Sequence, residues 1–97
     1  MKLNAYEFLA LDEVMNHVSD FDKLELVEMA KNGERVDGWH NEVTVEDIVA
    51  RLEVSVNAAK GYIASLAKKD LIECTDPEED YDMICITKEG VLEWDAR

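Results

Sequence analysis

The sequence predicts a small α+β domain that is mainly α-helical and contains one antiparallel β-hairpin. Five segments repeat apolar residues at the spacing of a helix face. The segment 71–87 instead contains two short runs that are typical of strands, on either side of an acidic turn that holds the single proline, Pro77. The chain has 97 residues, of which 47% are hydrophobic, which is enough for one packed core. We therefore expect a single domain spanning residues 1–97.

Two helices are expected in the first third of the chain. The first covers 4–18, and its apolar face comprises Tyr6, Phe8, Leu9, Leu11, Val14, Met15 and Val18. The second follows a start at 19–22 that resembles a capping box. Its inward residues are expected to be Leu24, Val27 and Ala30, with Leu26 and Met29 at the flank. Asn32 and Gly33 tolerate a left-handed backbone and are expected to end it.

Residues 43–69 are expected to form a short strand and two consecutive helices. Val43 lies in the strand, and Thr44 with Asp47 three residues later forms a capping box for the third helix. Ser55 is a suitable N-cap for a fourth helix that ends near Lys69. The apolar residues of the third helix are Ile48, Val49 and Leu52, and the inward residues of the fourth are Ala59, Ile63 and Leu66.

The last quarter of the chain is expected to be a hairpin followed by a helix. Strands at 71–75 and 81–87 flank an acidic loop, and Ile84 and Ile86 share one strand face. Thr87 is expected to cap a final helix whose apolar residues are Val91, Leu92 and Trp94.

Three segments carry a resemblance to a known family: TVEDIVARL at 44–52, LAKKDLIE at 66–73 and ITKEG at 86–90. They resemble the winged helix-turn-helix domains of bacterial MarR-type and ArsR-type regulators, in an unusually acidic form. The resemblance implies a helix-turn-helix at 45–69 and a wing hairpin at 71–87 within a two- or three-stranded antiparallel sheet. Two turns that usually hold glycine in the family hold Glu53 and Asp70 here, and Asp70 can adopt the left-handed conformation at some cost.

The fourth helix corresponds to the recognition helix of that family. The window 54–69 contains three lysines and no acidic residue, whereas the whole chain has 10 basic and 23 acidic residues and a net charge of -13. The helix also lacks arginine, whose planar fork reads guanine and clamps phosphate. The residues implied to reach DNA are Asn57, Lys60, Tyr62, Ser65, Lys68 and Lys69.

The predicted wing opposes DNA binding. Its acidic residues are Asp76, Glu78, Glu79, Asp80 and Asp82. Carboxylates that lie within a Debye length of the phosphates, about 8 Å at physiological salt, should cancel much of the lysines' attraction. We therefore expect a lone domain to bind DNA weakly, and the acidic wing to contact a protein with a basic surface. Trp39, in a polar loop between glycines, is either an interface anchor or a lid over the core.

Two functions remain open on these grounds. The slightly preferred one is a regulator or inhibitor that acts through protein contact and mimics the charge of DNA, as small acidic proteins of phages and mobile elements do. The alternative is a DNA-binding transcriptional regulator that uses the helix at 56–69. The first and last helices of winged domains are frequent dimer surfaces, so a homodimer is also left open.

Other function classes find little support in the sequence. It has no glycine-rich phosphate loop, and His17 and His40 have no evident nucleophile beside them. Cys74 and Cys85 suggest neither a disulfide framework nor a metal site. No apolar run approaches the roughly 18 residues of a membrane span. We expect a cytoplasmic protein without catalytic activity, cofactor, metal or membrane partner.

Overall fold

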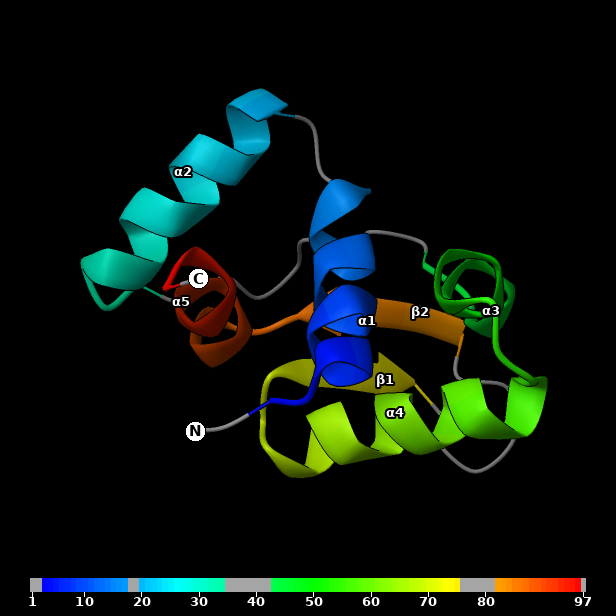
Figure 1. Ribbon diagram of the computed structural model, residues 1–97. Coiled ribbons are helices and arrows are strands. Elements are labelled where there is room, and N and C mark those ends of the chain that lie inside the picture. Colours follow the sequence, from blue (N-terminus) through cyan, green and yellow to red (C-terminus); the bar gives the residue numbers. More distant parts are fainter. Residues whose placement is uncertain (1–2, 18–19, 35–42, 76–81, 97) are drawn as a thin grey trace.

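The computed structural model describes residues 3–17, 20–34, 43–75 and 82–96. These residues form five helices and one two-stranded antiparallel sheet (Figure 1). The elements are α1 (Ala5–Asn16), α2 (Asp20–Lys31), α3 (Val45–Leu52), α4 (Val56–Lys68), β1 (Ile72–Thr75), β2 (Asp82–Ile86) and α5 (Lys88–Asp95). The fold is α+β and mainly α-helical, as predicted.

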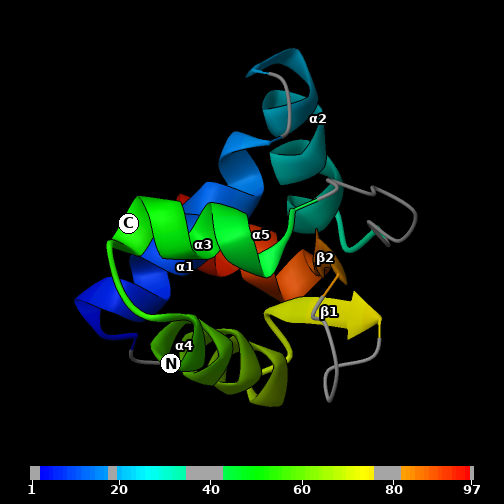
Figure 2. The same cartoon turned by 90° about the vertical axis from the view of Figure 1, so that its right-hand side faces the viewer.

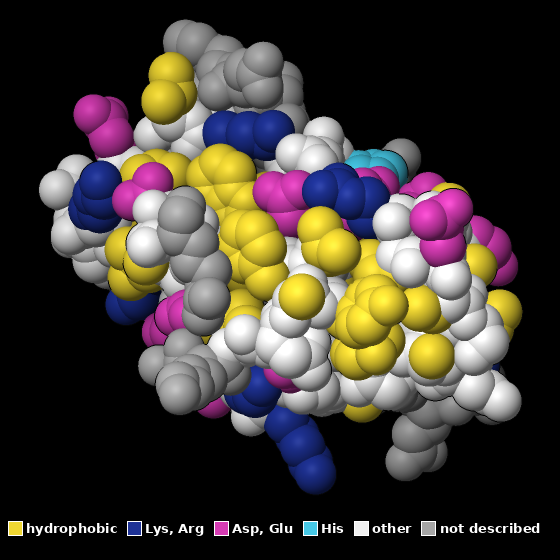
Figure 3. All heavy atoms as spheres, viewed as in Figure 1, with side chains coloured by type: hydrophobic (Ala, Val, Ile, Leu, Met, Phe, Trp, Pro, Cys, Tyr) yellow, Lys and Arg dark blue, Asp and Glu magenta, His cyan; other side chains and the backbone are white. Residues whose placement is uncertain are grey.

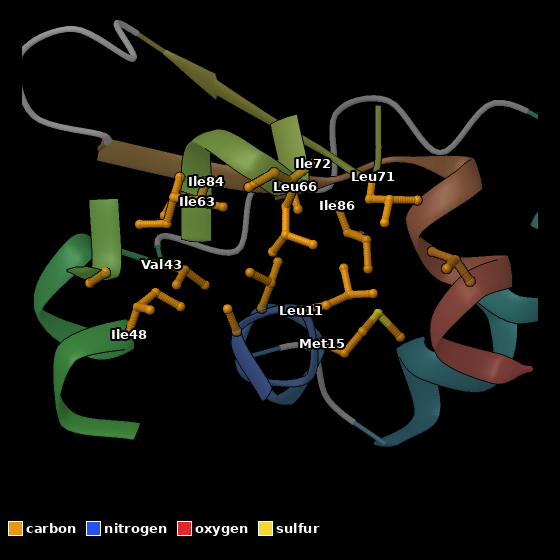
Figure 4. Close-up of a cluster of buried hydrophobic side chains, with 14 of the residues drawn as sticks. Leu11, Met15, Val43, Ile48, Ile63, Leu66, Leu71, Ile72, Ile84 and Ile86 are labelled. Atoms are coloured by element: carbon orange, nitrogen blue, oxygen red, sulfur yellow. The ribbon is translucent and has the colours of Figure 1, made fainter. Parts of the chain in front are cut away.

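Helix α1 occupies the middle of the molecule. It packs against α3, α4, α5 and β2, while α2 packs mainly on α5 (Figure 1). Figure 2 shows α4 beneath α3 and beside β1. The core lies between α1 and the hairpin, and Leu11 and Met15 of α1 point toward the sheet (Figure 4). The buried partners drawn around them include Ile63, Leu66, Ile84 and Ile86.

Helix α1 begins with a capping box that fixes its first turn. The backbone N–H of Glu7 donates to Oδ1 of Asn4 at 2.8 Å, and the N–H of Asn4 donates to Oε1 of Glu7 at 3.1 Å. Leu11, Val14 and Met15 are buried as predicted. Sequence periodicity did not predict that Glu7 would be buried as well.

The predicted orientation of α2 is wrong for Leu24, which is 72% exposed rather than inward. Leu26, predicted at the flank, is fully buried, and Ala30 one turn later is buried as expected. The apolar residues of α2 occur at many angles around its axis, so the sequence pattern alone did not specify which of them pack inward. Gly33 has φ +78°, consistent with the predicted C-terminal cap.

The segment from α3 to α4 follows the sequence prediction closely. The N–H of Thr44 donates to Oδ2 of Asp47 at 3.0 Å, and Ser55 Oγ accepts from the N–H of Ala58 at 3.2 Å. Glu53 ends α3 in the left-handed region, with φ 55°. The predicted inward residues Ile48, Leu52, Ala59, Ile63 and Leu66 are all buried, whereas Val49 is partly buried.

The hairpin pairs Ile72 with Ile86 and Thr75 with Asp82, with a register shift between Glu73 and Thr75. Val43 adds an isolated antiparallel bridge to Ile84, at the position predicted for a short strand. The hairpin is joined to α5 through Thr87. Its hydroxyl donates to the carbonyl of Asp70 at 2.6 Å and accepts from the N–H of Gly90 at 3.0 Å. Thr87 therefore caps α5 as expected.

Candidate interaction surfaces

The six recognition-helix candidates are divided between two sides of the molecule. Tyr62, Ser65 and Lys69 face α1. The ring of Tyr62 stacks on Tyr6 with centroids 5.4 Å apart and planes inclined by 25°. The others point outward to different degrees: Asn57 and Lys68 are exposed, and Lys60 is half-buried. The structure thus does not bring the six together on one exposed face.

The carboxylate of Glu7 joins α1 to the C-terminal end of α4. It is 5% exposed, and its Oε2 accepts from the hydroxyl of Ser65 and from Nζ of Lys69, the latter at 2.6 Å. Burial opposes ionisation of this carboxyl. The hydrogen bonds from Lys69, Ser65 and the backbone of Asn4 outweigh burial, however, and lower its pKa from 4.5 to about 2. The charge of Lys69 is therefore engaged within the molecule.

Arg51, the one arginine in the described ranges, is also engaged within the molecule. Its Nη2 donates to Oδ2 of Asp12 at 2.6 Å, and its Nη1 donates to Oε1 of Glu13 at 3.2 Å. The hydrogen bond to Asp12 raises the pKa of Arg51 against the opposing effect of burial. Lys and Arg side chains can be seen beside Asp and Glu side chains on this face (Figure 3).

Asp12 extends the same cluster to α5. Its Oδ1 accepts from the indole N–H of Trp94 at 2.7 Å, and its Oδ2 accepts from Nδ2 of Asn16 at 3.2 Å. Burial would raise the pKa of Asp12, but the hydrogen bonds from Trp94 and Arg51 lower it overall. One carboxylate thus links three helices, α1, α3 and α5. We define the Asp12 cluster as Asp12, Glu13, Arg51 and Trp94.

Acidic residues are concentrated on particular helices. The helices α1, α2 and α5 carry ten acidic residues against three lysines. Helix α4 carries two lysines, Lys60 and Lys68, and no acid. Helices α2 and α5 pack together toward one end of the molecule, beside the central helix α1 (Figure 1).

Trp94 lies in a groove between these acidic helices. One hollow of about 390 Å³ is lined by Lys23, Leu24 and Val27 of α2 together with Trp94 and Asp95. A second, of about 220 Å³, shares Trp94 and Asp95 and is also lined by Phe8 and Asp12 of α1. We call the two hollows together the Trp94 groove. This groove was not predicted from the sequence, because Leu24 was expected to lie in the core.

Several predicted site residues fall outside the part of the chain that the structure describes. These are Asp76, Glu78, Glu79 and Asp80 of the predicted wing, and Trp39. Asp82 is the first residue of β2. The acidic wing therefore stays a prediction from the sequence.

Comparisons of the chain with protein-family models, curated proteins and solved structures gave no match. Among the described residues, no group of three or more His, Cys, Asp or Glu side chains is arranged to hold a metal ion. No helix in the described ranges combines the length and apolarity required to cross a membrane.

Proposed function

We propose that this protein is a non-enzymatic, acidic winged-helix regulator or inhibitor that contacts a protein with a basic surface and mimics the charge of DNA. The order of its elements supports the winged-helix interpretation, since a hairpin follows two consecutive helices and precedes a last helix. The bridge between Val43 and Ile84 lies where such domains add a third strand. Glu53 and Asp70 have φ values of 55° and 60°, at the two turns where the family usually has glycine.

The observation that carries the functional proposal is that Lys69 and Arg51, two cations that could otherwise contact DNA phosphates, form ion pairs within the molecule. Lys69 is paired with Glu7, and Arg51 with Asp12 and Glu13. On α4 this leaves Lys60 and Lys68, neither of which forms an ion pair with another described residue. Affinity for DNA depends steeply on the number of phosphates neutralised, and two lysines provide few contacts against a net charge of -13.

One observation favours DNA binding as a second candidate. The outward side of α4 is open: Asn57 and Lys68 are exposed, and among the described residues no atom beyond the surrounding helix lies within 4 Å of the position that a Cβ on Gly61 would occupy. A backbone or a groove edge can approach such a surface closely. In this reading α4 enters the major groove, and dimerisation would double the number of lysines facing DNA.

Affinity capture followed by competition with DNA tests the preferred function. The tagged full-length protein is incubated at low salt with a lysate of its source organism, and retained proteins are identified by mass spectrometry. We expect a basic nucleic-acid-binding protein that is released by salt and by added duplex DNA, because both compete for the same charges. Retention of no basic protein, or of one that duplex DNA fails to displace, would contradict the proposal.

A further inference from the structure

We infer that the Trp94 groove binds a basic amphipathic helix of the partner protein, an inference that rests on the proposed function and locates its contact. An amphipathic helix docks by placing its apolar face in a hydrophobic groove, with anchor residues spaced about one turn apart. Three properties of the groove match such a ligand: its apolar lining, its fixed walls and the charge of the helices around it.

The apolar lining is partly accessible to solvent: Leu24 is exposed, and Val27 and Trp94 are half-buried. Leu24 is 72% exposed, more than any other large hydrophobic residue described. Single exposed leucines are common on protein surfaces, but Leu24 adjoins Val27 and Trp94 in one hollow. The second hollow, which Phe8 lines together with Asp12 and Asp95, is more polar, so the apolar contact is centred on the first hollow. In the space-filling view of Figure 3, hydrophobic side chains are visible on the surface across the middle of the molecule, with charged side chains beside them.

The walls of the groove are held in place by polar contacts. The indole of Trp94 donates to Asp12, which Arg51 holds in turn. Nζ of Lys31 lies 3.2 Å from Oδ2 of Asp95, which connects the C-terminal ends of α2 and α5. An aromatic side chain that is already oriented loses little conformational freedom on binding. Trp94 is therefore suited to act as a fixed anchor at the centre of the contact.

The negative charge around the groove favours a partner helix that carries basic residues. The three helices that form the groove carry ten acidic residues against three lysines. Four of these acids are already paired, Glu7 with Lys69, Asp12 and Glu13 with Arg51, and Asp95 with Lys31. Glu25 and Glu28 of α2 and Glu89 of α5 are exposed, and together with the net charge of -13 they attract a ligand with lysine or arginine on its polar face. A second copy of this chain would bring another net charge of -13 against the same surface. Charge complementarity thus favours a basic partner helix over a homodimer at this site.

Two synthetic peptides of identical composition test the inference with the full-length protein. Both contain only leucine and lysine over about five helical turns. In the segregated peptide the leucines lie on one helical face, and in the scrambled peptide they do not. Fluorescence anisotropy of the labelled peptides gives their affinities, and the indole N–H resonance of Trp94, assigned with Trp94→Phe, reports contact at the groove.

Leu24→Asp separates groove binding from general attraction. This substitution adds a negative charge, so simple electrostatics would strengthen binding of a lysine-rich peptide. We expect the substitution instead to lower the affinity for the segregated peptide at least about tenfold, because the apolar contact is lost. Val56→Asp is the matched control: Val56 is 46% exposed on α4, outside the groove, and an acid is tolerated in the first turn of a helix. We expect this control to bind as the wild type does.

Each other outcome is informative. Equal binding of both peptides, unaffected by Leu24→Asp, would overturn the inference while leaving the proposed acidic contact intact. Failure of both peptides to bind at low salt would count against the inference and the proposed function together. A wild-type dimer in sedimentation that becomes monomeric with Leu24→Asp would show that a second copy covers the groove, which also overturns the inference.

Discussion

At the scale of single residues, the buried carboxylate of Glu7 joins the C-terminal end of α4 to α1. The contact between Asn4 and Glu7 is visible in the sequence, since the two residues have the three-residue spacing of a capping box. The other contacts were not predictable, because the partners Ser65 and Lys69 follow 58 and 62 positions later. Only the packing of α1 on α4 brings these side chains together.

We expect Glu7→Gln to lower the free energy of unfolding at pH 7 by about 3 kcal/mol, from the lowering of the pKa from 4.5 to about 2. Because the folded-state pKa is depressed, this stabilisation is complete above about pH 4.5 and is lost as the pH falls through about 2. Urea denaturation at pH 7 and pH 2 measures the effect, and the difference between wild type and variant should disappear at the lower pH. Glu46→Gln, at an exposed site on α3, is the control. Equal stability of Glu7→Gln and wild type at pH 7 would contradict this account.

At the scale of elements, capping residues were predicted better than packing faces. Thr44, Ser55 and Thr87 were all identified as caps, because a cap depends on residues three positions away. The inward face of α2 was not predicted correctly, since tertiary contacts with α5 select among several apolar residues. The close approach of Gly90 in α5 to the backbone of Leu71, just before β1, was likewise absent from the sequence pattern.

Gly90 and Gly61 provide a matched pair of helical glycines. A Cβ on Gly90 would overlap the carbonyl oxygen of Leu71, whereas a Cβ on Gly61 would meet no atom of the described residues within 4 Å beyond its own helix. We expect Gly90→Ala to destabilise the protein by about 1–3 kcal/mol or more, since the backbone must shift. Gly61→Ala should stabilise it by about 1 kcal/mol, because alanine favours the helix. Thermal denaturation compares the two, and opposite signs are the expected result.

In the turn between α3 and α4, Glu53 has a strained backbone conformation that a glycine would relieve. Glu53 has φ 55°, a conformation that costs a residue with a side chain about 1 kcal/mol relative to glycine. Glu53→Gly should therefore raise the free energy of unfolding by a similar amount in chemical denaturation. Glu53→Gln, which keeps the Cβ, should leave stability nearly unchanged. A stabilisation by Glu53→Gln as large as that by Glu53→Gly would indicate that charge, rather than backbone conformation, is responsible.

At the scale of the whole molecule, the proposed function depends on which charges are available at the surface. The net charge of -13 and the lysines of α4 were evident from the sequence. The ion pairs of Lys69 and Arg51 were not evident from the sequence, because their acidic partners lie on α1, far away along the chain. The Trp94 groove also depends on how three separate helices meet. The fold class was therefore predictable, whereas the surfaces on which the proposed function relies were not.

A titration of labelled random-sequence duplex DNA at low salt, repeated at increasing salt, tests the central claim most directly. Lys60→Glu removes the mid-helix cation of α4, and Lys88→Glu makes the same charge change on α5 as a control. We predict no binding at micromolar protein with any of the three proteins, since Lys69 and Arg51 are engaged internally. Micromolar or tighter binding by the wild type that weakens with salt, is lost in Lys60→Glu and persists in Lys88→Glu would contradict the account and establish α4 as a DNA-binding helix.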